Sequence, residues 1–167
     1  KRFISYIQGN LTLILFIITF FGIIFSENIV NLFAPGFEVG GERYLLASDM
    51  LKITFPYLFF ISLTAMSAGI FNTFNKFLLP AITPVFLNIS LIFSALYLTN
   101  IFSTPIIALA YGVLIAGILQ YMIQIPFLYK MDLLVAPKIS FKFSGVNKVM
   151  KLMLPAILGT AVVQINL

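Results

Sequence analysis

One stretch of this sequence places polar residues and prolines inside strongly apolar surroundings. It runs from Asn72 to Ser90, NTFNKFLLPAITPVFLNIS, and holds three asparagines, one lysine and two prolines. Amides can hydrogen-bond between helices or line a watery passage, whereas a proline bends a helix because it removes a backbone donor. The chemistry that these residues offer is therefore binding and change of shape.

The rest of the chain offers little catalytic chemistry. It contains no His and no Cys, which excludes imidazole and thiolate metal sites, cysteine nucleophiles and histidine acid–base catalysis. The sequence also has no phosphate-binding loop, zinc motif or nucleophile elbow. We therefore predict that the protein is not an enzyme, that it has no catalytic or metal-ligating residues, and that it carries no cofactor.

The composition places the chain in the membrane class. Hydrophobic residues make up 61% of its 167 residues and charged residues only 9%, and the mean hydropathy is +1.10. Soluble domains carry about 25% charged residues, and a spanning helix needs about 20 apolar ones. We predict an all-α, polytopic transmembrane helix bundle with four complete spans and the start of a fifth. The spans are 3–26, 53–75, 77–99, 105–129 and 152–167.

The charged residues separate by side of the membrane. The chain start, the Lys76 turn and the segment 130–151 are basic, and Asp132 is their only acid. The loop 27–52 on the other side holds the remaining acidic residues. The positive-inside rule makes 27–52 a periplasmic loop and 130–151 a cytoplasmic interfacial segment, with lysines close to anionic membrane lipids. The net charge of +5 thus reflects topology, and nucleic acid is not predicted as a partner.

Small and polar residues follow one face of two predicted spans. Asn75 and Lys76 are typical of a tight turn between spans. Two interpretations stay open for the faces themselves, because small residues and amides serve helix packing in lipid but also form polar stripes along a pathway. The faces are Ser62, Ala65, Gly69 and Asn72 in the second span, and Ala108, Gly112, Ala116, Gln120 and Gln124 in the fourth.

Five residues are the candidates for a functional role inside the spans. A proline inside a helix frees a backbone carbonyl, and bent helices are common in transporters whose bundles rock. An amide within the membrane must be satisfied by protein or water. The candidates for helix bending or cavity lining are Pro56, Asn72, Pro80, Pro84 and Asn88. We expect Asn72 and Asn88 to line a cavity or to bond between helices.

Three segments carry a resemblance to a known family. They are LKITFPYLFFISLTAMSAGIFNTFNKFLLPAITPVFLNISLI (Leu51–Ile92), LFAPGF (Leu32–Phe37) and LMLPAILGTAVVQIN (Leu152–Asn166). Along essentially its whole length the chain resembles the MurJ (MviN) family of bacterial lipid II flippases. The resemblance implies membership of the multidrug/oligosaccharidyl-lipid/polysaccharide exporter superfamily, whose members have about fourteen spans in two lobes that work by alternating access. It further implies that this chain is an internal piece of the first lobe.

The resemblance also implies a function and its partners. The substrate would be lipid II, the undecaprenyl-diphosphate-linked peptidoglycan precursor, moved across the bacterial inner membrane for cell wall synthesis and cell shape. Proteins of cell wall synthesis are implied as partners, and the charged residues that hold the diphosphate are implied to lie in spans outside this chain. The alternatives are a flippase for O-antigen-type polysaccharide lipids, a drug–cation antiporter of the same superfamily, and a membrane scaffold that needs no polar cavity.

Overall fold

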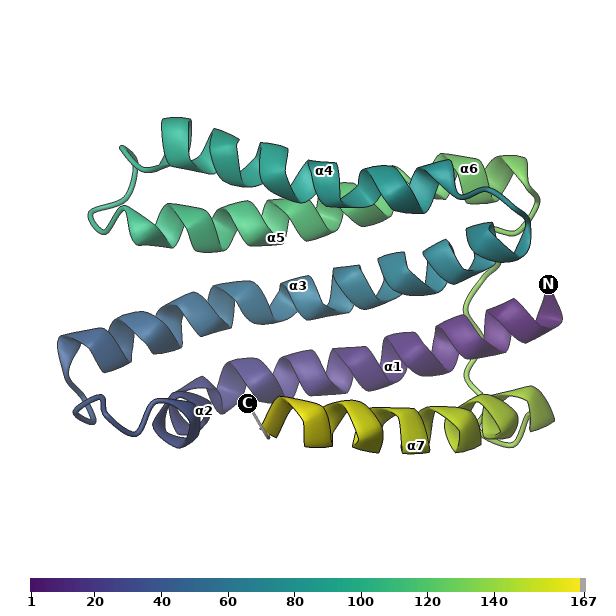
Figure 1. Cartoon of the computed structure of the whole chain (residues 1–167), viewed down its shortest axis with the longest axis horizontal. Helices are drawn as coiled ribbons and strands as arrows, with labels where there is room; N and C mark the ends of the chain where they lie inside the picture. The colour runs from purple at the N-terminus through teal and green to yellow at the C-terminus, as the bar shows by residue number, and fades with distance from the viewer. Residues whose placement is uncertain (166–167) are drawn as a thin grey trace. The chain divides into compact units, whose positions relative to one another are not determined.

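The computed structural model describes residues 1–165, which form helices, turns and extended connections (Figure 1). A π-helical turn, Ser94–Leu98, continues one of the helices, α4. The last two residues of the predicted fifth span, Asn166 and Leu167, lie outside the described residues. The helices are α1 (Arg2–Ile24), α2 (Ser26–Phe33), α3 (Glu42–Thr73), α4 (Leu78–Phe93), α5 (Ile106–Met122), α6 (Ile125–Lys130) and α7 (Ser144–Ile165).

Four helical stretches of the described chain are long and apolar enough to cross a membrane. They are Arg2–Ile24, Glu42–Thr73, Leu78–Leu98 and Ile106–Lys130. Their number equals that of the complete spans expected from the sequence, and the predicted all-α, polytopic fold class is confirmed. The remaining long helix, α7, already begins at Ser144, within the segment 130–151 that was predicted to be interfacial.

The segment 27–52, predicted to be a loop, is mostly helical. Residues up to Phe33 belong to α2, and α3 starts at Glu42. With 32 residues, α3 is about 48 Å long at 1.5 Å per residue, which exceeds the ~30 Å hydrocarbon core of a bilayer. Its charged first turns therefore fit outside the core without any loop. The charged residues predicted the end of a helix, whereas α3 continues through them; the periplasmic location of the connection stays a prediction.

Buried polar contacts hold α2 against the start of α3. The hydroxyls of Ser26 and Ser48, both fully buried, lie 2.9 Å apart in a hydrogen bond. The Tyr44 hydroxyl donates to the backbone carbonyl of Glu27 at 2.8 Å. Small hydroxyls allow the two helices to approach closely, and each buried group finds a partner.

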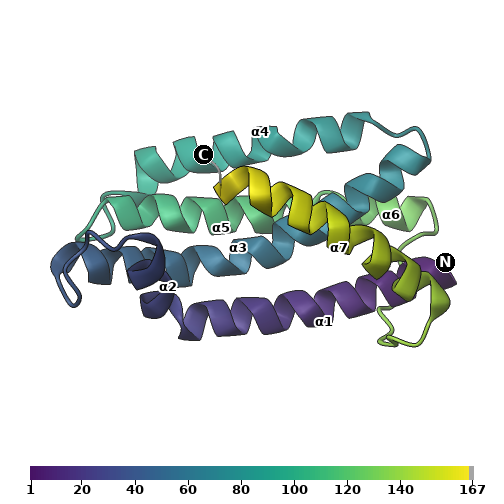
Figure 2. The same ribbon diagram turned by 60° about the horizontal axis from the view of Figure 1, so that its bottom comes forward.

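The contacts divide the chain into two compact units, and the larger comprises Ile14–Leu134. In this unit α5 lies between α3 and α4, as the views of Figure 1 and Figure 2 agree. The face of α5 in these contacts carries Ala108, Gly112 and Ala116, all of them buried. Small side chains let helix backbones approach in a membrane, where van der Waals contact takes over from the hydrophobic effect between helices.

Two helices of the larger unit end in the same way. Asn75 after α3 and Asp132 after α6 have positive φ angles of 57° and 56°. Each is followed by a residue whose N–H reaches back five positions, from Lys76 to Phe71 and from Leu133 to Leu128, at 2.9 Å in both cases. This is the Schellman arrangement, for which Asn and Asp are suited because their short polar side chains tolerate the left-handed conformation.

The two ends of the larger unit differ in charge. The α3–α4 turn with Lys76 and the end of α6 with Lys130 lie at one end, and α2 with the start of α3 lies at the other (Figure 1). The second end carries Glu27 and Asp49, and Lys52 pairs with Asp49 at 3.0 Å. This arrangement follows the charge pattern of the sequence, while the assignment of each end to a side of the membrane stays a prediction.

The smaller unit joins Lys1–Leu13 to the chain from Val135 onward. An extended segment, 133–140, reaches the first turns of α1 through hydrogen bonds on both sides of Gly9. The Lys138 N–H donates to the carbonyl of Ser5 at 3.0 Å. Asn10 then both accepts from the Ser140 N–H at 3.1 Å and donates to the Ser140 carbonyl at 3.0 Å. The predicted interfacial segment is thus fixed to a helix at this point.

Candidate functional site

The three candidate prolines occupy two kinds of position. Pro56 and Pro84 lie inside α3 and α4, where each leaves the carbonyl four residues earlier without its usual donor. Pro80 instead lies in the first turn of α4. A backbone N–H in the first turn has no partner within its helix, so a proline costs nothing there. Pro56 and Pro84 can therefore bend their helices, whereas Pro80 lies where α4 begins. A role of Pro80 in bending or cavity lining stays a prediction.

The two candidate asparagines lie on surfaces that the described residues leave uncovered. Asn72 lies in the last turn of α3, and Asn88 lies in the middle of α4; both side chains are exposed. Within residues 1–165 neither side-chain amide has a hydrogen-bond partner, and the two are not brought together. Bonding between described helices is therefore not their role. Lining of a cavity, or bonding to helices outside the described residues, stays a prediction for both.

The amides that do connect helices are the glutamines of α5. Gln120 donates through Nε2 to the carbonyl of Thr83 at 3.0 Å, and Gln124 donates to the Thr83 hydroxyl at 3.3 Å. Both glutamines are almost completely buried, with 2% and 0% of their surface exposed. Of the two interpretations left open for this face of α5, the structure supports helix packing.

Sequence reasoning missed the residues of α4 and of the π-helical turn after it that meet this face. Thr83, Ser90 and Ser94 are buried, and the Ser90 hydroxyl donates to the carbonyl of Gly112 at 2.9 Å. Their spacing of seven and then four residues keeps them on one side of a helix. That spacing was the available signal, but the candidates chosen from the sequence were the neighbouring prolines and Asn88, which lie on a different side of α4.

The second face singled out from the sequence has no such partner. Ala65, Gly69 and Asn72 of α3 are exposed, and a Cβ added at Gly69 would meet nothing within 4 Å among the described residues. Unlike the face of α5, this face of α3 is free within the described chain. Packing against further segments and a watery pathway both remain open for it.

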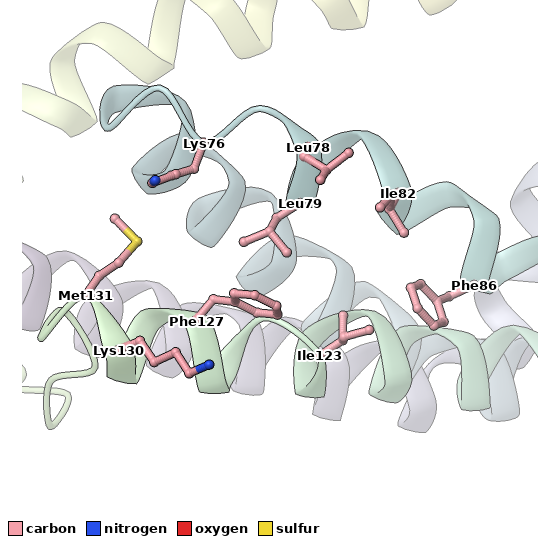
Figure 3. Close-up of a pocket in the computed structure, with 9 residues that line it drawn as sticks. All are labelled: Lys76, Leu78, Leu79, Ile82, Phe86, Ile123, Phe127, Lys130 and Met131. Atoms are coloured by element: carbon pink, nitrogen blue, oxygen red, sulfur yellow. The ribbon is translucent and has the colours of Figure 1, made fainter.

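A groove lies between the start of α4 and the end of α5 with α6 (Figure 3). It has a volume of about 540 Å³. Its walls are apolar side chains such as Leu79, Ile82 and Phe127, and Lys76 and Lys130 lie toward one end. Among the described residues no cluster of His, Cys, Asp or Glu that could hold a metal ion is found. The groove thus combines a long apolar wall with two cations.

Comparison with known proteins decides the family. The sequence model of the family described as lipid II flippase MurJ matches residues 1–167. The chain belongs to the lipid II flippase MurJ family. Its helices long enough to span a membrane and this membership make the parent a multi-pass membrane protein of a transporter family, which is not a family of catalytic enzymes.

Individual MurJ relatives align with the whole chain. It is 41% identical over 167 residues to a probable lipid II flippase MurJ of Buchnera aphidicola from Acyrthosiphon pisum, and 42% identical over 174 residues to that of Vibrio cholerae. It is 33% identical over 171 residues to the lipid II flippase MurJ of Burkholderia cenocepacia. Each alignment covers 100% of this chain and 33% of the relative. The chain thus spans about a third of the length of these MurJ proteins.

The polar contact between α4 and α5 predicts the effect of a single substitution in this chain. Thr83→Val keeps the shape of the side chain but removes the hydroxyl that accepts from Gln124. We expect the full-length protein to lose about 1 kcal/mol of unfolding free energy, because the buried amide of Gln124 is left without an acceptor. Chemical unfolding in detergent micelles, followed by circular dichroism, measures the loss.

Thr73→Val is the matched control for this substitution. The Thr73 hydroxyl also bonds the carbonyl four residues earlier, that of Gly69 at 2.9 Å, but it is exposed and receives no glutamine. We expect its loss to change stability by less than about 0.5 kcal/mol. Equal losses from the two substitutions would show that the glutamine contact contributes nothing.

Proposed function

We propose that this chain forms part of the first lobe of a lipid II flippase. The parent protein moves the undecaprenyl-diphosphate-linked precursor from the cytoplasmic to the periplasmic leaflet of a bacterial inner membrane by alternating access. The observation that carries the proposal is the family match over residues 1–167. The number of described helices that are long and apolar enough to cross a membrane also equals the number of complete spans predicted from the sequence.

The separation of charge between the ends of the larger unit supports the orientation. Lys76 and Lys130 lie at the end assigned to the cytoplasm, and Glu27 and Asp49 lie at the end assigned to the periplasm. Basic residues stay preferentially on the cytoplasmic side during insertion. With this orientation α1 runs from the cytoplasm to the periplasm.

Complementation by the full-length parent gene tests the proposal. The resident lipid II flippase of a test bacterium is depleted, the parent protein is expressed, and lysis is followed. Rescue is the expected result. Failure to rescue, with the protein inserted and abundant in the membrane, would overturn the proposal and favour transport of polysaccharide lipids or of drugs.

Within this function we propose that Asn72 and Asn88 line the cavity through which the polar headgroup moves. Both amides are exposed and unbonded within the described chain, on α3 and α4. A polar group in the membrane is costly unless protein or water satisfies it, and intramembrane polar residues usually face an interior cavity. Pro56 and Pro84 give the same two helices freedom to bend as the lobe rocks.

Asn88→Leu tests the cavity role directly. We expect about a tenfold fall in lipid II translocation into vesicles that contain the full-length protein, since the substitution removes a hydrogen-bonding group worth about 1.4 kcal/mol to a polar headgroup. Asn88→Gln should retain most of the rate, because it keeps the amide. An unchanged rate in the leucine variant, at equal protein content, would exclude the role.

A further inference from the structure

The groove between α4 and α6 has the dimensions of one membrane leaflet. Its α4 wall extends from Leu78 to Phe86, which is about 12 Å at 1.5 Å per residue. Half of a ~30 Å hydrocarbon core is about 15 Å. The groove runs between helices that span the membrane, so an occupant would lie along the membrane normal. A single acyl chain in one leaflet has this direction and a similar length.

The walls of the groove are apolar along that length. Leu79, Ile82 and Phe86 line it from α4, and Ile123 and Phe127 line it from the opposite side (Figure 3). Several of these side chains are open to the surroundings, with Ile82 40% and Phe127 39% exposed. An aliphatic chain is the chemistry that covers such a surface, because burial of apolar area needs no polar partner.

Two lysines lie at one end of the groove, away from Ile82 and Phe86 (Figure 3). Lys76 follows the left-handed residue Asn75, and Lys130 is the last residue of α6. Among the described residues neither lysine forms an ion pair, and no acidic side chain lines the groove. Two unpaired ammonium groups above an apolar channel complement a phosphate at the head of a lipid chain.

We propose that this groove binds an anionic phospholipid. The phosphate lies at Lys76 and Lys130, and one acyl chain lies along Leu79, Ile82 and Phe127. The proposal is independent of the proposed function, because the site needs only a bilayer and no transport. It gives the lysines of the α3–α4 turn and of α6 a specific ligand beyond their contribution to topology.

Quenching by brominated lipid measures this binding in the full-length protein. Phe127→Trp places a fluorophore in the groove of a chain that has no tryptophan of its own. The protein is reconstituted in phosphatidylcholine with a small fraction of either dibromo-phosphatidylglycerol or dibromo-phosphatidylcholine. The quenching measured in protein without the Phe127→Trp substitution is subtracted, so that the signal comes from the introduced tryptophan alone. We expect phosphatidylglycerol to bind at least about fivefold more tightly than phosphatidylcholine. This is the preference that results when the attraction of one lysine to an anionic headgroup favours binding.

Charge-matched variants show whether the two lysines are responsible. Lys76→Gln with Lys130→Gln should bring the preference for phosphatidylglycerol close to one. Lys142→Gln with Lys148→Gln removes the same charge from exposed lysines that do not line the groove, and should leave the preference unchanged. Ile82→Phe should reduce quenching of the Phe127→Trp fluorophore by both brominated lipids, because it adds bulk to the groove without a second tryptophan.

Three results would overturn the proposal. If the two brominated lipids quench equally in the protein that retains Lys76 and Lys130, the groove holds ordinary boundary lipid with no preference for an anionic headgroup. Absence of quenching by either lipid would mean that another segment of the full-length protein covers the groove. If the variant with Lys142→Gln and Lys148→Gln loses the preference for phosphatidylglycerol equally, the preference reflects the overall charge of the protein and not Lys76 and Lys130. Tryptophan emission and a monodisperse elution profile confirm in each case that the variant is folded.

Discussion

Replacing Gly112 with alanine is expected to lower the unfolding free energy of the full-length protein by about 1–2 kcal/mol. A Cβ at this position of α5 would lie 2.5 Å from the Ser94 hydroxyl oxygen and 2.9 Å from the Ser94 Cβ. Both distances are too short for van der Waals contact, so α4 and α5 must separate. The overpacking cost exceeds the ~0.5–1 kcal/mol that alanine gains over glycine within a helix.

A double-mutant cycle isolates this contact. Ser94→Gly removes both atoms that the new methyl group would meet, so it should largely restore the stability of the Gly112→Ala variant. We expect a coupling energy of about 1–2 kcal/mol between the two substitutions, within the range found for residues in contact. Chemical unfolding in detergent micelles gives the four stabilities of the cycle. Additive effects would show that the two helices do not approach at this point.

Gly69→Ala provides the matched control on another helix. Gly69 lies inside α3, and a Cβ there meets nothing within 4 Å among the described residues. Alanine should therefore leave stability unchanged or raise it by up to ~1 kcal/mol. If the change in unfolding free energy has opposite signs at Gly112 and Gly69, the difference comes from packing alone, because the two substitutions are chemically identical.

The spans could be predicted from the sequence because burial in lipid imposes a simple rule. A stretch of about 20 uncharged residues has few stable alternatives to a spanning helix, and four such helices lie within the part of the chain that the structure describes. The same rule fails outside the hydrocarbon core. Glu42 and Asp49 do not end a helix in water, so α3 continues through residues that were predicted to form a loop.

Residues that contact other helices were predicted less completely than the spans. Gln120 and Gln124 stood out because amides are rare in an apolar helix, and both prove to be buried. Their partner Thr83 was missed because a threonine can bond its own helix, as Thr83 does to the Leu79 carbonyl at 3.0 Å. Which hydroxyl also faces another helix depends on how two helices pack, and local sequence does not contain that information.

The contact of the segment 133–140 with α1 could not be predicted for a similar reason. The basic residues of the segment favoured an interfacial location, and nothing nearby in the sequence indicated a partner. Asn10 and Ser140 are separated by 130 positions, yet they form a reciprocal pair of hydrogen bonds. A polar residue near the end of a span can face water, a lipid headgroup or any neighbouring helix, so Asn10 alone did not indicate this contact.

Gly9→Ala is expected to detach the segment 133–140 from α1. A Cβ at Gly9 would lie 2.5 Å from the carbonyl carbon and 2.6 Å from the nitrogen of Lys138. These are backbone atoms, so no side-chain rotation can relieve the contact. The segment must move, which breaks the hydrogen bonds of Lys138 to Ser5 and of Ser140 to Asn10. We expect a loss of about 2–3 kcal/mol in the stability of this contact.

Limited trypsin digestion of the full-length protein in membranes measures the detachment. In the unsubstituted protein the hydrogen bonds around Lys138 should slow cleavage there, and Gly9→Ala should raise the rate at least about tenfold, as a loss of 1.4 kcal/mol or more predicts. Cleavage after Lys76, in the turn of the larger unit, serves as the internal control and should not change. Asn10→Leu should have a similar but smaller effect, because it removes hydrogen bonds without forcing the backbone apart.

The nature of the contact at Gly9 also distinguishes it from that at Gly112. Truncation of Ser94 should rescue Gly112→Ala, because a side chain causes that clash. Lys138→Gly should not rescue Gly9→Ala, because the clashing atoms remain in the backbone after the side chain is removed. Since Lys138→Gly also removes the trypsin site after residue 138, cleavage after Lys142 is the readout for this pair of variants. Rescue at Gly9 by this substitution would mean that the lysine side chain, and not the approach of the two backbones, limits the space there. Failure of rescue would leave glycine as the only residue that allows the segment to dock.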